Sequence, residues 1–357
     1  MFEDLLQGWG GEEAVIRYDE PTGAWMIVAV HDTTLGPGMG GTRLKPYAAP
    51  HDALADALRL SGAMTLKQAA ADLPYGGGKA VVAVPEVPPR DSEERRTLLL
   101  RYAEVVDALG GTYVTAADMN TGQADMDVVG ERTSHVLGRS PELGGAGDPA
   151  PGTAQGVFHG IVATAARAFG TGDLSGRTVL VQGVGSVGDR LAGLLHEAGA
   201  TMILADIDPA RARATADRVG GTAVDAEGVV GFECDVYAPC ATGGVLSVAT
   251  IPRLRCSVVA GAANNQLATS EDAELLAEAG ILYAPDFVIN AGGVLHLAGS
   301  ETLGWSPEQM SARLAGIGDT LLEVYDAADR DDITTDAAAG RLARSRIEAA
   351  RASVTGS

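Results

Sequence analysis

The stretch TVLVQGVGSVGDRLAGLL, residues 178–195, combines a short apolar strand, a glycine-rich turn and the start of a helix. Its glycines, Gly183, Gly185 and Gly188, form a GxGxxG pattern. In this context each glycine has a purpose: a tight turn, close approach of a pyrophosphate, and packing of the helix on the strand. The free N–H groups at the start of the helix then face the phosphates. The stretch therefore predicts the phosphate-binding turn of a Rossmann domain.

A second apolar strand, in TMILADID, leads to Asp206. A carboxylate at this place accepts hydrogen bonds from the adenosine ribose hydroxyls and repels a 2′-phosphate. No arginine follows before Arg211, so the pattern favours NAD over NADP as the cofactor. Further short apolar runs alternate with helical segments, which is typical of a parallel sheet with helices on both faces. We place this NAD-binding domain at residues 149–330.

The part of the chain before residue 149 has a different pattern of strands and helices. Residues 24–32 are apolar and β-branched, as in a strand, and residues 51–73 repeat apolar side chains at helical spacing. Residues 79–85 indicate a buried strand that a proline ends, and residues 92–111 an amphipathic helix with acidic residues in its first turn. These segments predict a second α/β domain.

A stretch rich in glycine and proline, residues 136–153, indicates a linker between the two domains. We therefore expect an N-terminal α/β substrate-binding and catalytic domain at residues 1–148, a Rossmann domain after it, and a cleft between them. From about residue 306 the pattern is helical to the end of the chain.

Composition narrows the class of protein. The 357 residues carry a formal net charge of −21, which argues against nucleic acid as a partner because phosphates would not be neutralised. No apolar run is long enough to cross a bilayer, and the start is not a secretory signal. Three cysteines suggest neither a disulfide framework nor a metal site. We expect a cytoplasmic protein without a metal or a membrane partner.

The stretch LPYGGGKAVV, residues 73–82, directs attention to a lysine. The chain has only three lysines, Lys45, Lys67 and Lys79, and the last ends the run of three glycines. We expect the glycines to form a turn that folds Lys79 back toward Lys67 in the preceding helix. Two close ammonium groups disfavour each other's charge, and burial adds to this, so the pKa of one falls toward neutrality. A neutral amine is a competent general base, and a remaining cation can hold a carboxylate.

An acidic partner is expected in TAADMNTGQADMD, at the end of a strand. Asp118 stands where the strand gives way to a loop, and Asp125 and Asp127 are its rivals. Spacing alone does not choose among the three.

Several ordered motifs together identify a family. They are LGPGMGGTR (35–43), MTLK, LPYGGGKAVV, AADMNTGQADMD, GRSPELGGAG, GVGSVG, YAPCATGG, VAGAANNQLA and ILYAPDFVINAGGV. The chain resembles, over essentially its whole length, the Glu/Leu/Phe/Val dehydrogenases, and within them it is most similar to actinobacterial phenylalanine dehydrogenases. The resemblance implies reversible, NAD-dependent oxidative deamination of an L-amino acid to its 2-oxo acid and ammonia. It also implies a homo-oligomer assembled through the N-terminal domain, and a C-terminal helix, about residues 331–357, that packs back on that domain.

The resemblance also implies roles for single residues. Lys79 is then the base that activates water, and Asp118 exchanges protons with the amino group. Lys67 and Asn264 hold the substrate carboxylate, and Gly40 and Gly41 line its approach. The residues implied for the cofactor are Gly183, Gly185, Ser186, Val187, Gly188, Asp206, Ile207, Thr153, Ala238, Cys240, Ala262 and Asn290, of which Thr153 and Asn290 hold the nicotinamide carboxamide.

The side-chain pocket implied by the resemblance is apolar. It consists of Met39, Met64, Ala117, Val294 and Leu297, with no partner for a glutamate side chain. Overall similarity favours L-phenylalanine as the substrate. Met39 and Val294 are bulkier than the alanines that we expect at these positions in the nearest phenylalanine enzymes. These two residues favour the alternative, a leucine or valine dehydrogenase.

Two other classes are alternatives. A 2-hydroxy-acid dehydrogenase needs a histidine–carboxylate pair at the nicotinamide, and none of the six histidines stands in such a pattern. A non-catalytic NAD-binding regulator would have no reason to keep both GGGK and Asp118.

Overall fold

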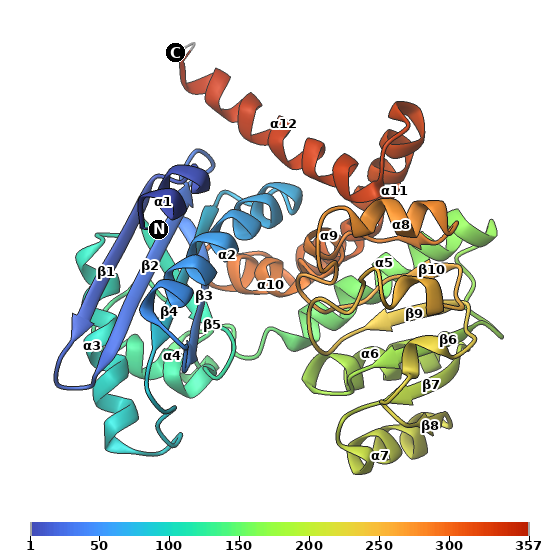
Figure 1. The fold of residues 1–357 in the computed structure, drawn as a ribbon, viewed down its shortest axis with the longest axis horizontal. Helices are drawn as coiled ribbons and strands as arrows, with labels where there is room; N and C mark the ends of the chain where they lie inside the picture. The colour runs from blue at the N-terminus through green and yellow to red at the C-terminus, as the bar shows by residue number, and fades with distance from the viewer. Residues whose placement is uncertain (1, 356–357) are drawn as a thin grey trace. The chain divides into compact units, whose positions relative to one another are not determined.

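The computed structural model describes residues 2–355, which divide by contacts into two compact units. Unit 1 contains the chain up to Asp148 together with Leu297–Gly304 and the part from Ala343 onward. Unit 2 contains Pro149–His296 and Trp305–Leu342. Each unit is built on its own sheet, which confirms the predicted α/β class with two domains (Figure 1).

Unit 1 is built on a five-stranded sheet in the order β1-β2-β4-β3-β5. Its strands are β1 (Glu13–Asp19), β2 (Ala24–Asp32), β3 (Gly38–Lys45), β4 (Gly76–Ala83) and β5 (Tyr113–Ala117). β1 and β4 are antiparallel to β2, whereas β3 runs parallel to both β4 and β5. The carboxyl ends of β3, β4 and β5 therefore share one edge of the sheet.

Helices cover both faces of this sheet. α1 (Phe2–Trp9) and α2 (Pro50–Ala70) pack on one face, where Ile27, Val81 and Leu58 share an apolar core. α3 (Glu93–Ala108) and α4 (Gln123–Val129) pack on the other, with Val82 and Tyr102 in a second core. Strand alternation assigns neighbouring residues to opposite cores, so odd-numbered β4 residues, Lys79 among them, face α2.

The three glycines before Lys79 do not form the turn that the sequence predicts. Gly76, Gly77 and Gly78 are the first residues of β4 and form no turn. They are glycines because the surroundings leave no room: a Cβ on Gly77 would lie 2.0 Å from Thr65 Oγ1, and one on Gly76 would lie 1.8 Å from the Asp32 carbonyl oxygen. The run thus allows α2 and the neighbouring chain to pack directly on the strand.

Later segments complete unit 1. The 3₁₀ helix η1 (Pro141–Leu143) follows α4, and the second half of α10 (Gly292–Glu301) belongs to this unit, as does the end of α12 (Thr335–Thr355). Arg346 on α12 donates from Nη1 to the carbonyl oxygens of Ala69 (3.1 Å) and Ala70 (2.8 Å). A cation there complements the carbonyl end of α2.

Unit 2 is built on a six-stranded parallel sheet in the order β11-β10-β9-β6-β7-β8. Its strands are β6 (Thr178–Gln182), β7 (Thr201–Ala205), β8 (Thr222–Val224), β9 (Val236–Pro239), β10 (Val258–Val259) and β11 (Leu282–Tyr283). The chain leaves β6 in one direction and returns to its other side at β9, so the carboxyl end of β6 lies at the topological switch point.

The helices of unit 2 connect and flank these strands. They are α5 (Ala150–Phe169), α6 (Ser186–Glu197), α7 (Pro209–Val219), α8 (Asp272–Glu278), α9 (Asp286–Ile289), α11 (Pro307–Asp331) and the short 3₁₀ helices η2 (Val229–Gly231) and η3 (Ile251–Arg253). Within residues 2–355, no helix combines the length and the apolar character that crossing a bilayer requires.

Candidate active site

Lys79 and Asp118 come together in unit 1. The amine Nζ of Lys79 lies 3.1 Å from Oδ2 of Asp118, which directly follows β5. The Lys79 side chain is only 6% exposed and that of Asp118 20%, so this ion pair is largely shielded from water. Of the three candidate aspartates, Asp118 is therefore the one in contact with the lysine.

A glycine on the strand between them makes this contact possible. β3 lies between β4 and β5, and Gly41 occupies the place past which the Lys79 side chain must reach. A Cβ on Gly41 would lie 2.8 Å from the Asp118 Cβ and 2.5 Å from the Ala117 carbonyl oxygen. Gly41 therefore leaves the space in which the ion pair forms.

The loop after β5 fixes Asp118. Its backbone N–H donates to Thr121 Oγ1 (2.8 Å), and that hydroxyl donates to the Thr42 carbonyl (2.8 Å). Asn120 has a φ of 62° and donates from Nδ2 to the Leu44 carbonyl (3.0 Å). Arg95 on α3 donates to the Asn120 carbonyl (2.6 Å) and pairs with Asp125. Asp125 thus anchors the loop.

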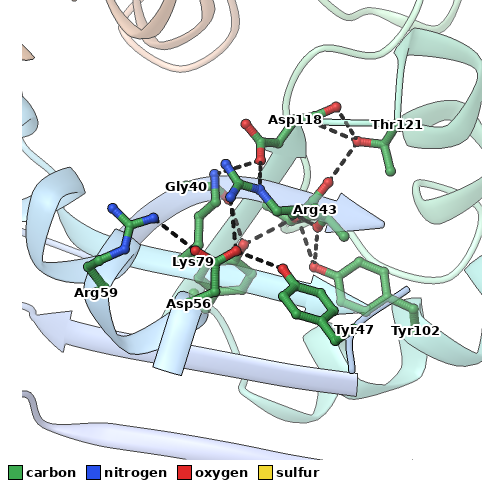
Figure 2. A network of polar contacts seen from close by, with 12 residues as sticks. Gly40, Arg43, Tyr47, Asp56, Arg59, Lys79, Tyr102, Asp118 and Thr121 are labelled. Atoms are coloured by element: carbon green, nitrogen blue, oxygen red, sulfur yellow. Dashed lines mark hydrogen bonds and ion pairs between the residues drawn. The ribbon is translucent and has the colours of Figure 1, made fainter. Parts of the chain in front are cut away.

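A cation that sequence analysis did not single out completes this site. Arg43, on β3, donates from Nε to Asp118 Oδ2 at 3.1 Å, the same oxygen that Lys79 contacts (Figure 2). Burial lowers the pKa of the Lys79 amine, Asp118 opposes this, and Arg43 lowers the pKa further; it lies below the ordinary lysine value. Strand alternation in GMGGTR could have placed Arg43 on the face of Gly41.

The Asp118 carboxylate is held in its ionised form. Burial by itself would raise its pKa, but the charges of Lys79 and Arg43 outweigh burial and lower the pKa of Asp118 to about 2. The carboxylate therefore remains an anion at any pH near neutrality. The pair can accept a proton at the amine and hold a cationic group at the carboxylate.

The other residues expected at the substrate lie in both units. Lys67 is a half-buried residue in the last turn of α2, and Gly40 on β3 accepts a hydrogen bond from Tyr113 Oη at its carbonyl (2.5 Å). Of the expected pocket residues, Met39, Met64, Ala117 and Leu297 belong to unit 1, whereas Val294 belongs to unit 2. Met39 and Leu297 are buried, and Met64 and Ala117 are half-buried. Asn264 belongs to unit 2.

In unit 2 the glycine pattern of residues 183–188 forms the expected turn between β6 and α6. Gly183 has a φ of 93°, and a Cβ on Gly188 would lie 1.9 Å from the Gly183 carbonyl oxygen, whereas Gly185 faces open space. Ser186 and Val187 begin α6, so their N–H groups belong to the free end of the helix. This cradle fits a pyrophosphate, which needs close backbone approach and free N–H groups.

Asp206 lies at the end of β7, beside this turn. Its carboxylate accepts hydrogen bonds from the N–H groups of Val184 (2.9 Å) and Asp208 (2.9 Å). Arg211 pairs with it at 3.5 Å. Ile207 is 93% exposed and offers an apolar surface next to the carboxylate. Such a pair fits an adenosine, with hydroxyls for the carboxylate and a base for the apolar side chain.

The remaining residues expected at the cofactor lie at the carboxyl ends of β9 and β10 and nearby. Asn290 Nδ2 donates to Asn264 Oδ1 (2.8 Å) and to the Ala262 carbonyl (3.1 Å). The Asn290 Oδ1 atom is buried and has no hydrogen-bond partner among the described residues, as an acceptor reserved for a carboxamide N–H would be. Ala238 is buried in β9. Burial also raises the pKa of the Cys240 thiol to about 12, so this side chain is uncharged.

Thr153 lies in the first turn of α5. Its hydroxyl donates to the Pro149 carbonyl at 3.0 Å, and Gly293 packs against it closely enough that a Cβ there would lie 2.7 Å from its Oγ1. Together with Asn290 and Asp206, these residues give unit 2 donors and acceptors suited to the two ends of a nicotinamide dinucleotide.

Comparisons with known proteins identify the family. Residues 21–135 match the family model described as Glu/Leu/Phe/Val dehydrogenase, dimerisation domain, and residues 207–354 match Glutamate/Leucine/Phenylalanine/Valine dehydrogenase. The chain is 43% identical to a leucine dehydrogenase of Geobacillus stearothermophilus, over 97% of this chain and 93% of the relative. It is 44% identical to a valine dehydrogenase of Streptomyces virginiae, over 96% and 95%.

A solved structure extends the likeness to three dimensions. The crystal structure of L-tryptophan dehydrogenase from Nostoc punctiforme matches with a TM-score of 0.82 and 38% identity, and the match covers 98% of this chain and 99% of that one.

Proposed function

The chain belongs to the Glu/Leu/Phe/Val dehydrogenase family, and we propose that it is an NAD-dependent leucine or valine dehydrogenase. Membership of the family makes it an L-amino-acid dehydrogenase acting on small-molecule substrates, with an NAD(P) cofactor. The reaction proposed is the reversible oxidative deamination of a branched-chain L-amino acid to its 2-oxo acid and ammonia. This proposal replaces the two alternatives, a 2-hydroxy-acid dehydrogenase and a non-catalytic regulator.

The observation that carries the proposal is the shielded pair of Lys79 and Asp118, with Nζ and Oδ2 3.1 Å apart. A base for deamination acts in its neutral form, and burial together with Arg43 shifts the pKa of Lys79 in the direction that favours this form. The ionised Asp118 supplies the negative charge that a substrate ammonium or iminium group requires.

The choice of a branched-chain substrate departs from the interpretation based on overall similarity, which favoured phenylalanine. Relatives that are leucine and valine dehydrogenases support the alternative instead. The volumes of Met39 and Val294 point the same way, because each leaves less room for an aromatic ring. A methylene in such a pocket discriminates by only about 1–3 kcal/mol, so we expect activity on more than one apolar amino acid.

The chain's own residues have distinct duties in the proposed mechanism. Lys67 and Asn264 bind the substrate carboxylate, and Asp118 holds the amino group. A nicotinamide bound in unit 2 would supply the acceptor for the hydride of the substrate α-carbon. Asp118 takes a proton from the substrate ammonium group and later returns it to the departing nitrogen. Lys79 takes a proton from the water that adds to the iminium carbon. Asp206 holds the ribose and favours NAD, while Thr153 and Asn290 hold the carboxamide.

A substrate panel tests the proposal. The absorbance of reduced nicotinamide is followed with NAD⁺ and, separately, L-leucine, L-valine, L-phenylalanine, L-tryptophan, L-glutamate and a 2-hydroxy acid. We expect the highest kcat/KM with leucine or valine and none with the 2-hydroxy acid. A preference for phenylalanine would support the prediction from overall similarity instead. Inactivity with every amino acid would refute the function.

A further inference from the structure

Asp118 Oδ2 is shared by two cations. Lys79 Nζ and Arg43 Nε each lie 3.1 Å from this single oxygen, and they reach it from adjacent strands, β4 and β3 (Figure 2). Lys79 and Asp118 are given roles by the mechanism, but Arg43 has none.

Arg43 is itself held from its far side. Its Nη1 lies 2.9 Å from Oδ2 of Asp56, on α2, and that oxygen also accepts a hydrogen bond from the Tyr47 hydroxyl at 2.7 Å. Arg59, one turn further along α2, donates to the other Asp56 oxygen at 2.9 Å. The side chains of Arg43 and Asp56 are only 15% and 14% exposed. A chain of alternating charges therefore leads from Lys79 through Asp118 and Arg43 to Asp56.

Arg43 and Asp56 keep their charges at working pH. Burial disfavours the Arg43 cation, but Asp118 and Asp56 outweigh burial and raise its pKa above the ordinary arginine value. Burial would raise the pKa of Asp56, but the Tyr47 hydroxyl and Arg43 lower it instead. Arg43 and Asp56 act on the amine in opposite senses: Arg43 lowers the pKa of Lys79, and Asp56 raises it.

We propose that Arg43, anchored by Asp56, is a positioning residue for the reaction: its guanidinium fixes the Asp118 carboxylate beside the Lys79 amine and keeps that amine available as a base. The proposal rests on the proposed function and adds a residue to it. A guanidinium suits the task because it stays charged and its planar fork binds two carboxylates at once. Arg43 touches Asp118 rather than the reacting atoms, so it acts through its neighbours.

The charged groups that act on Lys79 come from three neighbouring elements: Arg43 from β3, Asp118 from the loop after β5 and Asp56 from α2. Lys67 lies about three turns beyond Asp56 along α2. β2 places Ala29 opposite Lys79. The variants below leave Asp118 and Lys67 in place, so a change in behaviour reports Arg43 or Asp56.

The experiment compares the pH dependence of kcat/KM for deamination in four variants. In Arg43→Met the loss of a cation stabilises protonated Lys79, so the acid limb should move to higher pH, and kcat should fall by up to roughly 10²-fold as Asp118 loses its position. In Asp56→Asn the loss of an anion should move the limb to lower pH. Arg43→Lys keeps the charge and should return the limb toward the parent position, with kcat only partly restored.

Arg59→Met is the matched control, because Arg59 contacts the same Asp56 carboxylate but not Asp118, and its side chain is 54% exposed. We expect its pH profile to equal that of the parent protein. If Arg43→Met folds but its limb stays in place, or if Asp56→Asn moves the limb upward, Arg43 is only a structural link between β3, α2 and the β5 loop.

A second readout is independent of turnover. Because the chain has only three lysines, ¹³Cε-lysine labelling gives three signals per chain, and Lys79→Arg identifies the one to follow by NMR as pH changes. Its titration should shift upward in Arg43→Met and downward in Asp56→Asn. If the parent protein oxidises no amino acid while these shifts occur, the proposed function fails, although Arg43 still controls the charge of Lys79. If the shifts are absent, Arg43 does not control that charge, whatever the activity. Should Arg43→Met not fold, Arg43→Lys and Asp56→Asn decide the question alone.

Discussion

Lys79 differs from the other two lysines of the chain in its surroundings. Lys45, on the neighbouring strand, lies with Nζ 4.3 Å from the centre of the Tyr47 ring and is half-buried. Lys79 is almost fully buried and shares the Asp118 carboxylate with Arg43. A buried amine beside a permanent cation gives up its proton more readily than an exposed one. The same side chain thus has the buried surroundings that the proposed base requires at position 79, and lies against an aromatic ring at position 45.

Replacing each of these two lysines tests the difference between them. Lys79→Ala should lower kcat for deamination by at least about 10²-fold, the usual effect of removing a general base, because the amine beside Asp118 is lost. Lys45→Ala is the control and should retain parental kcat. Steady-state rates with leucine and NAD⁺ measure both. Near-parental turnover in Lys79→Ala would remove Lys79 from the mechanism.

At the scale of elements, the active site depends on how α3 fastens the loop after β5. Arg95 on α3 donates from Nε to Asp125 Oδ1 (2.6 Å) and from Nη2 to the Asn120 carbonyl (2.6 Å). Arg95 is 2% exposed, so this anchor lies in the interior. These contacts fasten the loop that carries Asp118 to α3.

Removing this anchor should therefore cost stability. Arg95→Met leaves Asp125 as a buried, unpaired carboxylate, and we expect the free energy of unfolding to fall by about 3–5 kcal/mol. The control is Arg96→Met, one residue away, because Arg96 pairs with Glu131 on the surface, where such pairs contribute only about 0–1 kcal/mol. Denaturant unfolding measures the loss of stability in each variant, and hydrogen exchange of α3 and α4 shows whether the loss lies at these helices. Equal losses in both variants would contradict the role of Arg95.

The end of β7 allows a test of cofactor choice. Asp206→Ser removes the carboxylate that we expect to bind the ribose and repel a 2′-phosphate, and it releases Arg211 from its 3.5 Å contact. The ratio of kcat/KM for NADP⁺ to that for NAD⁺ should rise by roughly tenfold or more, since a hydrogen bond to a charged group contributes about 1.5–3 kcal/mol. Asp208→Ser, which retains a capping side chain for α7, should leave the ratio unchanged. An unaltered ratio in Asp206→Ser would show that the Asp206 carboxylate does not determine the preference between NAD⁺ and NADP⁺.

At the scale of the whole molecule, the sheet of unit 1 has an edge that suits another copy. β1 is an edge strand in the described sheet, and it exposes Ile16 and Tyr18, 37% and 52% accessible, on the face of α1 and α2. An open strand edge with apolar side chains is a ready site for association. Residues 21–135 match a dimerisation domain, a range that begins just after β1, and we expect the homo-oligomer to use this edge.

A charge on this edge should weaken assembly. Tyr18→Glu should shift the protein to a smaller species in sedimentation at equal concentration, because a carboxylate would be desolvated in the interface. Val248→Glu, at a site that is 72% exposed in unit 2, is the control and should assemble as the parent does. If both variants sediment like the parent, the interface lies elsewhere.

Sequence alone determined the Rossmann unit and the α/β class, because these follow from local patterns: strand and helix periodicity and GxGxxG. A lysine after glycines made Lys79 a candidate, and the resemblance carried by ordered motifs gave the family and named Asp118. Sequence was wrong about the glycine turn, since a close approach that forbids a Cβ arises from chain segments far away in sequence. Only the tertiary structure showed the contact between Lys79 and Asp118 and revealed Arg43 and Asp56. The charges that act on Lys79 come from β3, α2 and the loop after β5, and only folding brings these elements within a few ångströms, where burial makes electrostatic interactions strong.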